Sequence, residues 1–154
     1  FGLALRAAGN KMNVFIMQFM KGPWKAGERK ALKELSEYVE YEAMGDGFTW
    51  DTENPEQDKK TARNAFDTAK EKLMSGKYQM VILDEINYVL DYKFFPLDEF
   101  LETLRNKPKD VHVVCSGRNA HEKLIAMADL VTEMKLIKHP YDDQGIPAQK
   151  GIEF

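Results

Sequence analysis

The stretch Met80-Val81-Ile82-Leu83-Asp84-Glu85-Ile86 (MVILDEI) decides the fold of this chain. An unbroken apolar run that contains β-branched residues ends there in two adjacent carboxylates. A run this short and this apolar is typical of a parallel strand that is buried on both faces. The carboxylates then emerge at the carboxyl end of the strand, which is where open α/β sheets place their ligands.

Segments with the periodicity of strands and of helices alternate along the rest of the chain. Strands are predicted at residues 13–19, 38–44, 80–84, 111–115 and 130–135, and helices at 26–37, 54–75, from Pro96 onward and from Asn119 onward. This alternation is typical of a parallel sheet with right-handed crossovers. We therefore predict an α/β fold with helices on both faces of a parallel sheet, formed by residues 1–154 as one domain.

Two of the predicted helices begin with capping signals. Asn54 precedes Pro55, and Gln57 can complete a capping box with Asn54. Asn119 and Glu122 have the spacing of a second capping box. We therefore expect Asn54 and Asn119 to be the N-caps of these two helices.

Composition excludes several classes of protein. The formal net charge is −3, so no overall attraction to nucleic acid or to an anionic membrane is expected. No apolar run approaches the roughly 20 residues of a membrane span. With a single cysteine, Cys115, no disulfide within the chain is possible, which favours a cytoplasmic protein. Cys115 lies in an apolar strand and is interpreted as a core residue rather than a nucleophile.

From the first residues we expect the native protein to continue upstream. The segment from Phe1 to Gly9 has the pattern of a helix that a glycine ends, but no capping residue and no strand precedes it. One more strand of the sheet is therefore expected before Phe1.

Asp84 and Glu85 are the first candidates for a site. An acid at the carboxyl end of a central strand is the usual magnesium holder of P-loop nucleotide-binding proteins. The alternative is a central strand that runs into a polar loop, and the stretch alone does not favour either interpretation. Strand alternation points the two side chains to opposite faces, so we do not expect them to act as an equal pair.

Several stretches together resemble one family. They are FGLALRAAG at residues 1–9, QFMKG at 18–22, GFTW at 47–50, VILDE at 81–85, SGRNAH at 116–121, ADLVTEM at 128–134, KHP at 138–140 and the segment 145–154. In this order and spacing the chain is similar to the P-loop type of ATP:corrinoid adenosyltransferase. The resemblance implies a P-loop NTPase-like sheet and a transfer of the 5′-deoxyadenosyl group of ATP to the Co(I) centre of a corrinoid, with release of triphosphate. ATP, Mg²⁺ and a corrinoid are the small molecules it implies.

The sequence departs from the family pattern at one place. In the family a Gly-rich P-loop with a Lys-Thr pair directly precedes the stretch that begins here at Phe1, and this sequence contains no G-x-x-x-x-G-K-[ST] motif. We therefore expect the first strand and the P-loop upstream of Phe1.

The resemblance also implies roles for individual residues. Glu85 would lie near Mg²⁺, with Asp84 supporting it or binding through water. Phe48 and Trp50 would lie against the corrinoid and displace its lower axial ligand, which makes the cobalt easier to reduce. Their spacing alone favours two aromatics that anchor a loop to the core, and only the resemblance favours the corrinoid role.

Four further residues are candidates for nucleotide binding. Arg6 could reach phosphate, close an interface with a neighbouring subunit, or simply be solvated. Arg118 and Asn119 follow the strand of Cys115 at the ligand-binding edge, where Arg118 could pair with triphosphate at two points. Lys21 follows a strand end and could face an anion, or be a solvated lysine.

Partners and alternatives follow from the same resemblance. The cobalt must arrive reduced, which implies an electron donor such as a reduced flavoprotein, and the family implies a homodimer. Two alternatives stay open at this point. One is a non-catalytic corrinoid-binding or regulatory module that lacks a functional P-loop, and the other is a P-loop ATPase or kinase that would release ADP and phosphate.

Overall fold

A parallel sheet is the centre of the computed structural model, which describes residues 1–20, 27–43 and 55–152. In these residues the sheet has four strands in the order β2-β1-β3-β4, and every neighbouring pair is parallel. The strands are β1 Val14–Gln18, β2 Val39–Ala43, β3 Met80–Asp84 and β4 His112–Cys115. The predicted α/β fold with a parallel sheet is therefore confirmed, and the MVILD run forms the strand β3.

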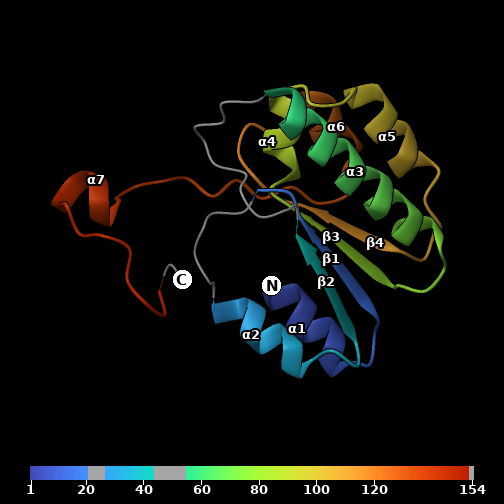
Figure 1. Ribbon diagram of the computed structural model, residues 1–154, viewed down its shortest axis with the longest axis horizontal. Coiled ribbons are helices and arrows are strands. Elements are labelled where there is room, and N and C mark those ends of the chain that lie inside the picture. The colour runs from blue at the N-terminus through green and yellow to red at the C-terminus, as the bar shows by residue number, and fades with distance from the viewer. Residues whose placement is uncertain (21–26, 44–54, 153–154) are drawn as a thin grey trace.

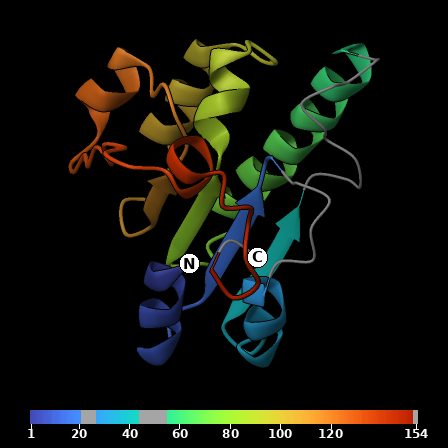
Figure 2. The ribbon, with the colours of Figure 1, turned by 90° about the vertical axis from the view of Figure 1, so that its left-hand side faces the viewer.

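Helices cover both faces of this sheet. They are α1 Gly2–Gly9, α2 Gly27–Glu34, α3 Pro55–Met74, α4 Ile86–Asp91, α5 Leu97–Arg105, α6 Glu122–Met127 and α7 Pro140–Gln144. Figure 1 shows α1 and α2 on one side of the sheet and α3 to α6 on the other, while α7 lies apart from it. Figure 2 shows α1 and α2 near the ends at which the strands begin. The opposite ends of the strands are left for a site.

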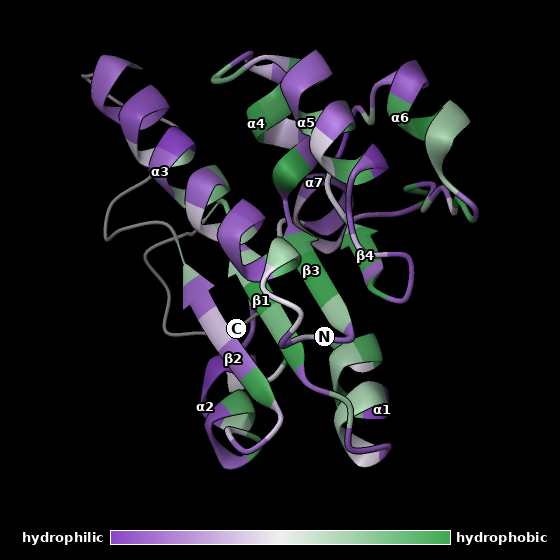
Figure 3. Cartoon of the chain, turned by 90° about the vertical axis from the view of Figure 1, so that its right-hand side faces the viewer, coloured by the Kyte–Doolittle hydropathy of each residue, from purple (hydrophilic) through white to green (hydrophobic). Residues whose placement is uncertain are grey.

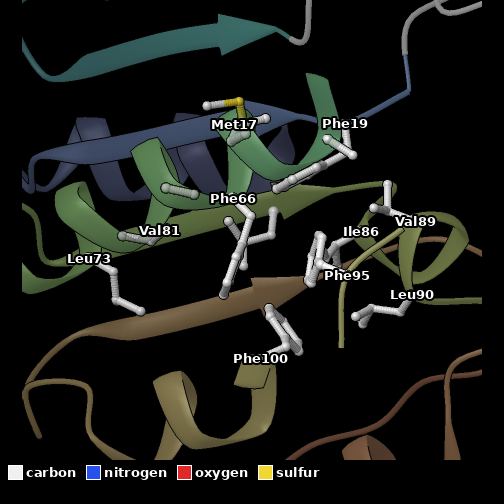
Figure 4. Packing of buried hydrophobic residues seen from close by; sticks show 14 of the residues in the cluster. Met17, Phe19, Phe66, Leu73, Val81, Ile86, Val89, Leu90, Phe95 and Phe100 are labelled. Carbon is white, nitrogen blue, oxygen red and sulfur yellow. The ribbon is translucent and has the colours of Figure 1, made fainter. Parts of the chain in front are cut away.

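Strand alternation divides the core between the two faces. Phe15 and Val81 point toward α3, whereas Ile16 and Ile82 point toward α1 and α2. On the α3 side aromatic rings fill the space under the helices, and Phe66 stacks on Phe95 with ring centroids 4.4 Å apart (Figure 4). Figure 3 shows β1 and β3 as largely apolar strands and α3 as a largely hydrophilic helix, and such apolar runs are expected for a sheet buried on both faces.

Three details differ from the sequence predictions. The stretch 130–135 forms no strand, because no neighbouring strand pairs with it in the described part of the chain, and the side chain of Leu130 is 82% exposed. Helix α4 was not predicted and begins directly after Glu85. Asn119 is not an N-cap, since the Nδ1 atom of His121 accepts the capping bond from the Lys123 backbone N–H.

Among the described residues, no helix is long and apolar enough to cross a membrane. The Asn54 cap lies outside the described residues, although α3 begins at Pro55 as predicted.

Candidate active site

Polar side chains meet at the edge of the sheet where the strands end. Gln18 is the last residue of β1, Asp84 is the last residue of β3, and Ser116 directly follows β4. Tyr41 of β2 joins this group, because its hydroxyl donates a hydrogen bond to Gln18 Oε1 at 2.6 Å. Residues of β1, β2 and β3 and the residue that follows β4 therefore form a single hydrogen-bonded group, at the edge where α/β proteins bind ligands.

Asp84 is held on both of its carboxylate oxygens. Gln18 Nε2 donates to Oδ2 at 3.0 Å, and Ser116 Oγ donates to Oδ1 at 2.7 Å. Burial raises the pKa of the half-buried Tyr41, so its hydroxyl stays protonated and remains a donor to Gln18. A carboxylate offers about four lone-pair positions, so Asp84 keeps positions for further donors while its orientation is fixed.

Glu85 differs from its neighbour in conformation. It has φ 62° and ψ 20°, in the left-handed region, and it is the residue from which α4 begins. Its backbone N–H donates to Ser116 Oγ at 2.9 Å. The alternation expected for two successive strand residues does not apply, because β3 ends at Asp84. Left-handed non-glycine residues of this kind cluster at functional sites, where the surroundings hold them in place.

The partly buried Glu85 side chain has one carboxylate oxygen without a hydrogen-bond partner in the described structure. Within the described structure, Glu85 Oε2 and Asn87 Oδ1 are buried and have no hydrogen-bond partner. A Cβ atom at Gly117, whose φ is +118°, would lie 3.1 Å from Glu85 Oε2, so only glycine leaves this space open. Burial raises the pKa of Glu85, the charge of Asp84 raises it further, and Arg118 opposes both. Such an oxygen is stabilised by a cation or a donor that it can bind.

Comparison with known proteins assigns the chain to a protein family. The family model described as ATP:corrinoid adenosyltransferase BtuR/CobO/CobP matches residues 1–154. The chain belongs to this family. It is 39% identical over 154 residues to the corrinoid adenosyltransferase of Escherichia coli (strain K12), covering 100% of this chain and 77% of that protein. The corrinoid adenosyltransferase of a Sinorhizobium species is 42% identical over 156 residues, covering 100% and 72%. Corrinoid adenosyltransferase CobA of Salmonella typhimurium is 38% identical over 154 residues, covering 100% and 77%.

The assignment confirms the predicted family and enzyme class. The chain is an ATP:corrinoid adenosyltransferase, and the family has ATP and a corrinoid as substrates. Neither the non-catalytic module nor the ATPase or kinase is favoured by these similarities.

The remaining predicted site residues of the adenosyltransferase lie at different places in the structure. Arg118 is exposed and close enough to Glu85 to act on its charge. Asn119, at φ 57°, donates from Nδ2 to Asp91 Oδ2 at 2.8 Å. Arg6 is an exposed residue of α1, which Figure 3 shows beside the ends at which the strands begin. The other predictions, Lys21, Phe48 and Trp50, lie outside the described residues.

Cys115 is part of the packed interior of the adenosyltransferase. It packs against the core on the α3 side, and burial raises the pKa of its thiol to about 12. The thiol is therefore protonated at neutral pH, as the core interpretation predicts and a nucleophile would not be.

The sequence analysis did not predict four residues at the edge of the sheet where the strands end: Gln18, Tyr41, Asn87 and Ser116. Gln18 and Ser116 could have been found, because each is a polar residue that closes an apolar strand. Tyr41 carries no such signal, since its role depends on the pairing of β2 with β1.

Proposed function

We propose that Glu85 of this adenosyltransferase holds the Mg²⁺ of bound ATP and that Asp84 supports it. The observation that carries the proposal is the buried, unpartnered Oε2 of Glu85 at the carboxyl end of β3. Mg²⁺ prefers oxygen ligands and is commonly bound by one or two carboxylates together with phosphates and waters. When bound, Mg²⁺ neutralises part of the triphosphate charge.

The reaction we propose for this chain follows from its family. The electron pair of Co(I) in the corrinoid forms a bond to C5′ of ATP, the C5′–O bond breaks, and its electron pair leaves with triphosphate. Arg118, exposed next to Glu85, would bind the leaving triphosphate. Asn119, on the same loop, would help to bind the nucleotide, and Lys21 would face the triphosphate. Arg6 would bind nucleotide, either in its own subunit or across a homodimer interface.

The corrinoid would bind next to the carboxyl end of β2. That strand ends at Ala43, shortly before Phe48 and Trp50 in the sequence. By the family resemblance, these two aromatics would displace the lower axial ligand of the corrinoid and ease reduction of cobalt. A reduced flavoprotein would supply the electron, and the enzyme would work as a cytoplasmic homodimer.

The metal role is tested by Glu85→Gln in the full-length protein, assayed anaerobically with Co(I) corrinoid, Mg²⁺ and ATP. We expect the Mg²⁺ concentration for half-maximal rate to rise at least about tenfold, because a ligand charge is lost. Glu102→Gln, at an exposed position of α5, is the matched control and should leave the titration unchanged. An unchanged Mg²⁺ titration in Glu85→Gln removes this residue from the metal site.

The corrinoid role is tested by Trp50→Ala. The rate from Co(II) corrinoid should fall more than the rate from chemically prepared Co(I), because only reduction depends on loss of the axial ligand. Tyr141→Ala, at a 64% exposed aromatic, is the control. Equal losses with both corrinoids would contradict ligand displacement.

A further inference from the structure

Gln18 stands between a phenol and a carboxylate. Its Nε2 donates to Asp84 Oδ2 at 3.0 Å, and its Oε1 accepts from the Tyr41 hydroxyl at 2.6 Å. Gln18 and Asp84 are register partners in the sheet, so the hydrogen bond joins neighbouring strand ends. Each end of the amide therefore already has one hydrogen-bond partner within the protein.

Asp84 and Tyr41 together favour one orientation of the Gln18 amide. If the amide were turned over, Oε1 would face the carboxylate oxygen and two acceptors would repel each other. The phenol hydroxyl donates to Oε1 and thereby favours the orientation in which Nε2 faces Asp84. The guanidinium of Arg29 lies 5.2 Å from the centroid of the Tyr41 ring, which helps to hold the ring in place.

The neutral amide has a consequence for charge. A lysine in place of Gln18 would neutralise Asp84, and a glutamate would repel it. An amide holds the carboxylate in one orientation and leaves its full negative charge available to a cation. Both Asp84 oxygens already accept one hydrogen bond, from Gln18 and from Ser116, so Asp84 suits contact with a hydrated cation rather than direct ligation.

We propose that Gln18 is a positioning residue of the nucleotide site. Tyr41 orients Gln18, and Gln18 holds Asp84 so that the free lone pairs of Asp84 accept hydrogen bonds from the water ligands of the metal. The inference rests on the proposed function, in which Glu85 binds the metal itself. Partners behind a metal site commonly change metal affinity about 10- to 100-fold when they are removed.

The test measures Mn²⁺ binding by electron paramagnetic resonance in the full-length protein with ATP and without corrinoid, so it does not depend on turnover. Gln18→Met removes the amide and keeps the length of the side chain, and it should raise the Mn²⁺ dissociation constant about tenfold. Tyr41→Phe removes one oxygen and should raise it about threefold. The double variant should match Gln18→Met alone, because Tyr41 acts through Gln18.

Gln79→Met is the matched control, since this glutamine accepts from the Asn13 backbone N–H at 2.8 Å at the other end of the sheet. It should leave Mn²⁺ binding unchanged. A Gln18→Met protein that binds Mn²⁺ as the wild type does, while Glu85→Gln loses it, overturns this inference and leaves the metal assignment standing. If Glu85→Gln also binds Mn²⁺ normally, the proposed metal site itself is wrong. Additive losses in the double variant would overturn the role of Tyr41.

Discussion

Glu40 is the centre of a charged cluster that should contribute measurably to stability. Its carboxylate is hydrogen-bonded by Lys72 near the end of α3, by the hydroxyl of Tyr78, and by Lys77 at 2.9 Å. These donors, Lys72 foremost, hold the pKa of Glu40 at about 2, below its ordinary value of 4.5. The cluster joins the strand β2 to α3 and to the segment before β3. Glu40→Gln removes the charge and keeps the shape.

The structure bounds the size of the effect. The interval between the ordinary pKa and about 2 corresponds to about 3 kcal/mol of interaction with the charged form. The Glu40 side chain is 33% exposed, so solvent screens these pairs and about 1 kcal/mol is a realistic loss at pH 7. For a protein of this size, that loss lowers the melting temperature by about 2–4 °C.

Denaturant unfolding at several pH values provides the assay. Because the folded pKa is lowered, the stabilisation is present above the unfolded pKa near 4.5 and disappears as the pH falls toward 2. The difference between wild type and Glu40→Gln should therefore shrink across that interval. Glu71→Gln, at an exposed position next to Lys72 in α3, is the control and should show no such difference. A stability difference that is constant from pH 7 to pH 2 would refute the electrostatic argument.

Three further predictions concern Glu85, an ion pair and the core. Glu85→Gln should raise the melting temperature at pH 8 and not at pH 4, because burial raises the pKa of Glu85 in the folded protein, and the resulting destabilisation grows as the pH rises above the ordinary pKa of 4.5 and is complete above the raised pKa; calorimetry at both values checks this. Arg63 donates to both oxygens of Glu99, at 2.6 and 2.8 Å, and a double-mutant cycle in urea should give a coupling of about 0.5–1 kcal/mol, whereas zero coupling would contradict it. Phe100→Ala, at a fully buried ring, should cost about 3–5 kcal/mol in the same assay, against almost nothing for Leu130→Ala at an 82% exposed position.

The strands were predictable because their burial leaves a simple pattern. The MVILD run and the VFIMQ run are buried on both faces, and such runs are read directly as parallel strands. Residues 130–135 (LVTEMK) also contain apolar residues, but no strand pairs with them in the described residues, and pairing is not encoded in a local pattern. Helix α4 was missed because it follows β3 without a turn signal, starting from a left-handed Glu85.

The site was predictable only in part, for a related reason. Asp84 and Glu85 stand out because they end an apolar run. Their different surroundings could not be inferred, because these depend on the left-handed backbone at Glu85 and on hydrogen-bond partners from other strands. Gln18 and Ser116 are far from Asp84 in the sequence and reach it only through the strand order β2-β1-β3-β4.

Strand alternation places the residue of β2 that we expect to matter for stability and the residue that we propose for the site on opposite faces of the sheet. Glu40 and Tyr41 are successive residues, so their side chains point to opposite faces: Glu40 toward α3 and Tyr41 toward Gln18. Loss of the Glu40 charge should therefore lower stability and leave metal affinity nearly unchanged. Loss of the Tyr41 hydroxyl should lower metal affinity and leave stability nearly unchanged, because the ring and its packing remain. If both variants lowered metal affinity in proportion to stability, general loosening of β2 would explain them, and a specific hydrogen-bonded path from Tyr41 to Asp84 would not.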